Sequence, residues 1–211
     1  MNAYESEEQQ VEALKAWWQE NGKSVLFGAV LGIAIVFGWQ GWRTHVADVG
    51  AAASQSLAEM SDAALKNEKE RALAEGQRIL DEYGDTVYAD FAALGMAKLA
   101  VESNDPATAQ GHLQRVAEHP SDPGLADLAR LRLARLLLDQ GKGAEATAFL
   151  DKVTAAAHQG EVSLLRGDIA LAAGDRTAAG NAYRQALAAG LAGDELVRLK
   201  LDDLGVTEKA E

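Results

Sequence analysis

The sequence lacks cysteine altogether and is poor in proline and aromatic residues, with three prolines in 211 residues and 6% Phe, Trp and Tyr. The missing cysteines exclude disulfides, thiolate metal sites and cysteine nucleophiles. No window shows the period-two alternation of β-branched residues that a sheet needs, whereas alanine and leucine are abundant. The sequence therefore predicts an all-α protein made of closely packed helices.

Positive charge is scarce as well. Twenty Lys and Arg residues stand against 32 Asp and Glu residues, which gives a net charge of −12, and most of this excess follows residue 45. Nucleic-acid phosphates require clustered lysine and arginine, so no nucleic acid is expected as a partner. Anionic lipid headgroups would repel the same acidic region, so we expect it to stand off a membrane surface.

Motifs that carry chemistry are missing too. Of the four histidines, His112 and His119 are seven residues apart, and no carboxylate stands beside them at metal-ligand spacing. No glycine-rich phosphate loop, nucleophile elbow or zinc motif occurs. The sequence thus predicts a protein that is not an enzyme and that holds no metal and no cofactor.

The longest apolar run, from Ser24 to Trp42, contains 19 residues without a charge. A helix of that length spans roughly 29 Å, about the hydrocarbon thickness of a bilayer. Indole rings prefer the headgroup layer, so tryptophans at both ends are expected as interfacial anchors. They are Trp17 and Trp18 before the run, and Trp39 and Trp42 at its end. The run is predicted to be a single transmembrane helix.

Two alternatives to an uncleaved anchor remain. The small residues Ala51–Ala53 would suit a signal peptidase, but five glutamates precede the run, whereas a signal peptide begins with positive charge. A buried core helix could be equally apolar, but tryptophans would not usually bracket it. Lys15 and Lys23 precede the run and only Arg43 follows it closely, which favours an N-terminus inside the cell.

Within the run, Gly28 and Gly32 form a small-xxx-small motif. Such a motif lets the backbone of a second helix approach closely, although glycine is common in membrane helices in any case. Gly28 and Gly32 are the predicted contact with another membrane helix.

After residue 67 the chain repeats itself with a period near 34. Helices align on a large residue, with a small residue four positions earlier. The large residues are Leu80, Leu113, Leu150 and Tyr183, and the small ones are Gly76, Ala109, Ala146 and Ala179. Turns are expected at Asn104, Gly141 and Gly174, and small residues recur seven positions before them, at Ala97, Ala134 and Gly167. This period indicates helix-turn-helix repeats, in which Asn or Gly leaves the first helix through a left-handed turn.

The clearest unit, Arg166 to Leu187, resembles a tetratricopeptide repeat, with Gly167, Gly174, Ala179 and Tyr183 at that family's marked positions. A last helix beginning at Asp194 is expected to cap the stack, since the open end of a solenoid must be closed. The predicted organisation is as follows: residues 1–23, a short cytoplasmic segment; 24–42, the transmembrane helix; 43–67, a membrane-exit helix and first repeat helix; 68–193, tetratricopeptide-like repeats; 194–211, a capping helix and tail.

Such a stack offers a concave groove lined by the first helix of each repeat. Counting from the small positions gives the groove candidates Leu94, Lys98, Glu102, Leu131, Arg135, Asp139, Leu164 and Asp168. Their mixture of apolar and charged side chains suits weak binding of extended polypeptide segments. Each of them could equally be an ordinary solvent-facing residue.

The N-terminal block resembles that of the YfgM family. The shared features are the acidic segment Glu8 to Lys15, paired aromatics, Glu20 to Lys23, one span, and an exit containing Gly38 and Trp39. Two later blocks, LRLARLLLDQGKGAEATAFLD and LRGDIALAAGDRTAAGNAY, also resemble the repeats of that family, so the resemblance covers nearly the whole chain.

The resemblance implies an ancillary subunit of the bacterial SecYEG translocon in the inner membrane. It implies a cytoplasmic N-terminus, a periplasmic repeat domain, the chaperone PpiD and secretory polypeptides as partners, and no catalytic residues. The expected function is to assist the hand-over and folding of translocated proteins. The alternative is a structural scaffold for envelope assembly, or a role in stress-response regulation, exerted through the repeat domain.

Overall fold

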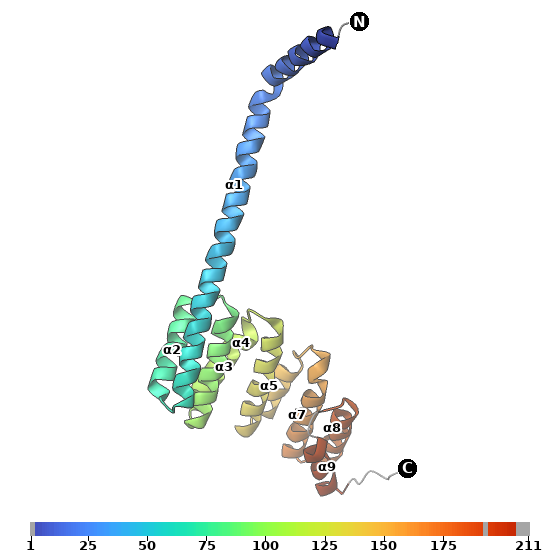
Figure 1. Cartoon of the computed structure of the whole chain (residues 1–211). Coiled ribbons are helices and arrows are strands. Elements are labelled where there is room, and N and C mark those ends of the chain that lie inside the picture. The colour runs from blue at the N-terminus through green and yellow to red at the C-terminus, as the bar shows by residue number, and fades with distance from the viewer. Residues whose placement is uncertain (1–2, 192–193, 206–211) are drawn as a thin grey trace. The chain divides into compact units, whose positions relative to one another are not determined.

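A computed structural model describes residues 3–191 and 194–205 of the chain. Within these ranges it contains helices and no strand, which confirms the predicted all-α class. The helices are α1 (Ala3–Leu65), α2 (Lys69–Glu82), α3 (Val87–Glu102), α4 (Pro106–Glu118), α5 (Pro123–Asp139), α6 (Gly143–Leu150), the 3₁₀ turn η1 (Ala156–His158), α7 (Gln159–Ala172), α8 (Arg176–Ala188) and α9 (Asp194–Asp203) (Figure 1).

The chain divides into two compact units, Met1–Ala51 and Ala52–Glu211. Helix α1 is long and apolar enough to cross a membrane. In its most apolar stretch of 18 residues, no residue is buried by the described part of the chain. Leu26, Phe27 and Phe37 in this helix are 62%, 72% and 70% exposed. An apolar surface that continues over so many helical turns is expected to contact lipid or another protein and not water.

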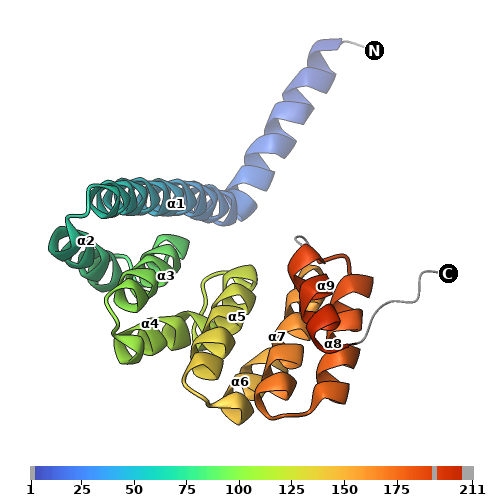
Figure 2. The ribbon, with the colours of Figure 1, turned by 90° about the horizontal axis from the view of Figure 1, so that it is seen from below.

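The second unit is built from helix pairs. The first helix of each pair, called helix A here, is the end of α1, then α3, α5 and α7; the second, helix B, is α2, α4, α6 and α8. In Figure 2 the pairs follow one another around an arc, with α3, α5 and α7 on its inner side and α4, α6 and α8 on its outer side. This arrangement confirms the predicted repeat solenoid.

Two residues after the end of each A helix, the chain passes through a residue in the left-handed region of the backbone. The angles φ are 56° at Asn104, 74° at Gly141 and 82° at Gly174, which confirms the three predicted turns. Asn67 has φ 60° and marks a fourth turn that the sequence analysis missed. In every case the next N–H donates to the carbonyl five residues earlier, as at Asp105 and Ala100 (2.9 Å), which is the Schellman motif.

The turn at Asn67 corrects the register of the first repeat. Positions are counted here from the left-handed residue of each turn. The fifth residue after it is a fully buried alanine, and the ninth residue after it packs against helix A. The two sets are Ala72, Ala109, Ala146 and Ala179, and Gly76, Leu113, Leu150 and Tyr183. The predicted pair Gly76–Leu80 is therefore displaced by one helical turn, and Leu80 is only partly buried.

Position 9 varies in size from glycine to tyrosine, and the facing residue of helix A varies in the opposite sense. Seven residues before the turns stand Met60, Ala97, Ala134 and Gly167. A Cβ added at Gly76 would lie 3.3 Å from Met60 Cε, and one added at Gly167 would lie 2.3 Å from the ring of Tyr183. A larger residue at one position of the pair thus stands opposite a smaller one at the other, because the interior must be filled without overlap. At Gly76 the side chain of Met96 in α3 also fills the space, with its Sδ 2.7 Å from such a Cβ.

Two buried carboxylates connect successive repeats. Asp90 in α3 accepts a hydrogen bond from the Ser121 N–H (2.7 Å), in the loop that leads to α5. Asp127 in α5 accepts from the N–H groups of Thr154 (3.1 Å) and Ala155 (2.9 Å), in the loop that leads to η1 and α7. Asp90 lies seven residues before Ala97, and Asp127 lies seven residues before Ala134. The same position in two successive repeats therefore carries a buried carboxylate that binds the following loop.

Helix α9 closes the C-terminal end of the stack, as predicted. Val197 and Leu201 are 1% and 4% exposed and belong to one core cluster with Tyr183 and Ala186 of α8. The predicted capping role of the Asp194 side chain and the predicted tail from residue 207 lie outside what the structure describes.

Candidate functional site

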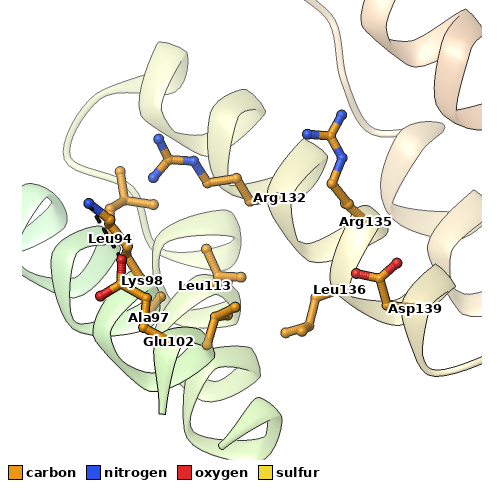
Figure 3. A pocket seen from close by; sticks show the side chains of 10 residues that line it. Leu94, Ala97, Lys98, Glu102, Leu113, Arg132, Arg135, Leu136 and Asp139 are labelled. Atoms are coloured by element: carbon orange, nitrogen blue, oxygen red, sulfur yellow. Dashed lines mark ion pairs between the residues drawn. The ribbon is translucent and has the colours of Figure 1, made fainter. Parts of the chain in front are cut away.

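A cavity of about 360 Å³ lies between α3 and α5, two of the helices on the inner side of the arc in Figure 2. Its apolar lining is Leu94, Ala97, Val101, Leu113 and Leu136, and its charged lining is Lys98, Glu102, Arg132, Arg135 and Asp139. Figure 3 shows nine of these side chains labelled, with Leu113 and Leu136 between the charged groups of the two helices. We call this cavity the α3–α5 groove.

Local sequence explains why the groove is apolar at its base. Ala97 is 2% exposed and is small enough for Leu113 of α4, itself 3% exposed, to reach the base from behind. Leu94 and Leu136 lie on the faces that α3 and α5 turn toward each other. The A helices therefore present leucine to the groove where they meet and charge where they reach solvent.

The charged side chains differ in how they are paired. Lys98 Nζ lies 3.7 Å from Glu102 Oε1, with side chains 74% and 54% exposed, so this pair is a surface ion pair of small energetic value. Arg135 lies 3.3 Å from Glu161 of α7. Neither Arg132 nor Asp139 has an ion-pair or hydrogen-bond partner in the described part of the chain.

A second cavity, of about 520 Å³, lies between the end of α1 and α3. Leu57, Leu65, Phe91 and Leu99 contribute its apolar surface, with Leu65 84% and Phe91 44% exposed. It shares Lys98 and Glu102 with the α3–α5 groove. The two cavities therefore adjoin across α3.

The structure brings five of the predicted groove residues together, namely Leu94, Lys98, Glu102, Arg135 and Asp139. Leu131 and Leu164 are instead core residues, 1% and 8% exposed. Leu131 belongs to the cluster that also holds Val162 and Leu165 of α7, so packing between repeats removes it from the groove surface. Arg132 lines the groove but was missed, although it precedes Arg135 by one helical turn.

Asp168 has a structural role that its sequence position did not predict. Its Oδ1 accepts hydrogen bonds from the Tyr183 hydroxyl (2.7 Å) and from Lys200 Nζ (2.7 Å). Burial, followed by the Asp168 carboxylate, raises the pKa of Tyr183 above its ordinary value, so the hydroxyl stays a donor. Asp168 joins α7, α8 and α9 and does not line the α3–α5 groove.

Buried carboxylates in the described residues, such as Asp90 and Asp127, hold neighbouring helices and loops together. No group of three or more His, Asp and Glu side chains there could hold a metal ion. His112 is half-buried in α4; burial first, and Arg115 second, lower its pKa below the ordinary value. It does not line the groove.

The predicted anchors and glycines all lie in the first unit. Trp17, Trp18, Trp39 and Trp42 are 49–60% exposed, and the ring centroids of each pair lie 6.5 Å and 5.4 Å apart. A Cβ added at Gly28 or Gly32 would meet no atom within 4 Å. The glycine face of the helix is thus open to a neighbour, and its contact stays a prediction.

Comparison with known proteins agrees with this architecture. A family described as "Tetratricopeptide repeat-like domain" matches residues 15–206. The chain is 32% identical to the "Ancillary SecYEG translocon subunit" of Haemophilus influenzae, over 94% of this chain and 97% of the relative. Proteins of the same name in Aggregatibacter actinomycetemcomitans and Escherichia coli are 34% and 30% identical, over 94% and 98% of this chain and 97% and 100% of the relatives. No solved structure matches the chain.

The alignments with these relatives cover almost the whole of this chain and therefore include both its apolar helix and its repeat domain. The resemblance of the N-terminal block and of the repeats is confirmed by this similarity. The chain belongs to the family of ancillary SecYEG translocon subunits with a tetratricopeptide repeat-like domain.

Proposed function

We propose that this protein is a membrane-anchored ancillary subunit of the SecYEG translocon. It binds polypeptides that emerge from the translocon, together with the chaperone PpiD, and assists their hand-over and folding without catalysing a reaction. The observation that carries the proposal is the near-full-length similarity to three proteins that bear the translocon-subunit name.

The proposed topology places residues 1–23 in the cytoplasm, 24–42 in the bacterial inner membrane and the repeat domain in the periplasm. The exposed apolar surface of α1 and the tryptophans at both ends of residues 17–42 support a bilayer-spanning helix. The excess of lysine before the span supports the orientation. An acidic repeat domain suits this position, because anionic lipids repel it and leave its concave side accessible.

The α3–α5 groove and the adjoining α1–α3 cavity are the proposed binding surface for polypeptides. Their bases are apolar and their edges carry both signs of charge. Such a surface offers hydrophobic contact to unfolded segments, while its charged edge limits affinity so that release remains fast. Weak, reversible binding is what hand-over to a folding partner requires.

Site-specific photo-crosslinking in living cells tests the proposal. A photoreactive residue at Gly28 is expected to form adducts with translocon subunits, and one at Arg135 adducts with secretory polypeptides or PpiD. The same residue at Arg184, an exposed position on α8 whose guanidinium bonds Asn181, serves as the control and should give neither. Absence of every adduct at both test positions would contradict the proposed function.

Inhibition of protein synthesis separates hand-over from scaffolding. Adducts between Arg135 and secretory polypeptides should disappear within minutes once synthesis stops, because no new chains then reach the translocon. Adducts with stable envelope components that persist unchanged would instead support the structural scaffold.

Replacing both Gly28 and Gly32 by leucine should weaken co-purification with membrane partners by about tenfold, because the backbones can no longer approach closely. Insertion should remain intact, since leucine is more apolar than glycine. Gly41→Leu is the matched control, because its position lies about 220° around the helix from Gly28. Equal recovery of partners with the double variant and with the control would exclude a role for the Gly28–Gly32 face.

A further inference from the structure

The α3–α5 groove contains one cation and one anion that are not neutralised. Arg132 and Asp139 both belong to α5, and neither has a partner among the described residues. They are seven residues apart, which corresponds to about 10.5 Å along a helix. Leu136 lies between them and contributes to the apolar base.

Charge is ordered in the same way on α3. Lys98 precedes Glu102 by one turn, as Arg132 and Arg135 precede Asp139 on α5. In Figure 3 the guanidinium groups of Arg132 and Arg135 lie toward one end of the groove and the carboxylate of Asp139 lies toward the other, whereas Lys98 and Glu102 lie side by side as an ion pair. The α5 side of the groove is therefore basic at one end, acidic at the other and apolar between.

The distance of about 10.5 Å along α5 between Arg132 and Asp139 sets the length of chain that can reach both charges. An extended chain covers the same length in about three residues. The space between Arg132 and Asp139 therefore fits a short extended segment with one or two apolar side chains.

We propose that the α3–α5 groove selects an extended polypeptide segment in which an acidic and a basic side chain flank two apolar residues. The acidic side chain pairs with Arg132, the basic side chain pairs with Asp139, and the apolar residues contact Leu94 and Leu136. This inference rests on the proposed function and adds to it the residue pattern that the groove recognises. Charge complementarity gives the selectivity, because a segment with two like charges meets repulsion at one end.

Peptide binding to the full-length protein in nanodiscs of neutral lipid tests this selectivity. Three fluorescent peptides of equal length differ only in the residues on either side of a Leu-Leu pair: Asp and Lys, Asp and Asp, or Lys and Lys. The mixed peptide should bind about fivefold more tightly than either like-charged peptide at low salt. The preference should vanish near 0.5 M salt, where exposed charges are screened.

Charge reversal at one end of the groove makes the test specific. Arg132→Asp should abolish the preference for the mixed peptide over the Lys-flanked one, since an acidic group then stands where the acidic residue of the peptide had its partner. Arg184→Asp, which introduces the same charge change on α8, should leave the original order intact. Equal affinities for the three peptides, no binding of any of them, or an unchanged order in Arg132→Asp would each overturn the inference. The translocon adducts at Gly28 do not depend on these peptides, so failure here leaves the proposed function standing.

Discussion

Replacing Gly167 by alanine should lower the free energy of unfolding of the repeat domain by about 2 kcal/mol. The added Cβ would lie 2.3 Å and 2.4 Å from two ring carbons of Tyr183. The ring cannot move aside readily, because Tyr183 is fully buried and its hydroxyl is bonded to Asp168. Alanine has the higher helix propensity, but that advantage of about 1 kcal/mol is smaller than the cost of the overlap. Pulse proteolysis of the full-length protein across a urea series measures the change.

Gly111→Ala is the matched control, since Gly111 lies within α4 and a Cβ there would meet nothing within 4 Å. That variant should be as stable as the original or more stable by up to about 1 kcal/mol. Adding Tyr183→Leu to Gly167→Ala should restore part of the lost stability, because alanine opposite leucine is the combination found at Ala134 and Leu150. Unchanged stability in Gly167→Ala, or no rescue by Tyr183→Leu, would contradict the idea of volume compensation within each repeat.

Replacing Asp127 by alanine should lower the free energy of unfolding by about 3 kcal/mol, because four donors lose a buried acceptor at once. The Asp127 side chain is 3% exposed and lies 2.7 Å from Arg130 Nη1. Its other oxygen accepts from the N–H groups of Thr154 and Ala155 in the next repeat. Asp85→Ala, at an exposed carboxylate in a turn, should change stability by less than about 0.5 kcal/mol.

The contribution of Asp127 should also depend on pH. Burial pushes its pKa upward, but the hydrogen bonds from Ala155 and Thr154 and the pairing with Arg130 outweigh burial and hold the pKa below the ordinary value. A carboxylate with a lowered folded pKa stabilises the fold above its unfolded pKa, near 4, and loses that contribution as the pH falls through the folded value. The difference in stability between the original protein and Asp127→Ala should therefore be constant from pH 7 to 5 and shrink below about pH 4. A difference that does not change down to pH 3 would exclude this role.

Patterns among residues close together in the sequence were enough to predict the helices and their turns. The uncharged run that ends at Trp42 and the turns at Asn104 and Gly141 each depend on residues within a few positions of one another. A left-handed turn needs only a residue that tolerates positive φ, so the sequence indicates it directly. The resemblance to a known family likewise depended on short sequence blocks at the N-terminus and in the repeats.

Contacts between distant residues could not be predicted in the same way. The register of the first repeat was misplaced by four residues, because Gly76 occupies the position held by a leucine or tyrosine in the later repeats. Only the structure shows that Met60 and Met96 fill the space that Gly76 leaves. Asp168 was expected in the groove but bonds Tyr183 and Lys200, since α9 packs where solvent was assumed.

By itself the sequence determined the apolar helix, the all-α class, the repeat period and the absence of recognisable catalytic motifs. These depend on composition and on neighbours along the chain, where the helical period fixes which residues share a face. The tertiary structure decided which of those faces remain open. It buried Leu131 and Leu164, left Arg132 and Asp139 without partners among residues 3–191 and 194–205, and placed Leu136 between them. The reason is that burial is set by how the next helix packs, and two sequences with the same period can pack that helix over different side chains.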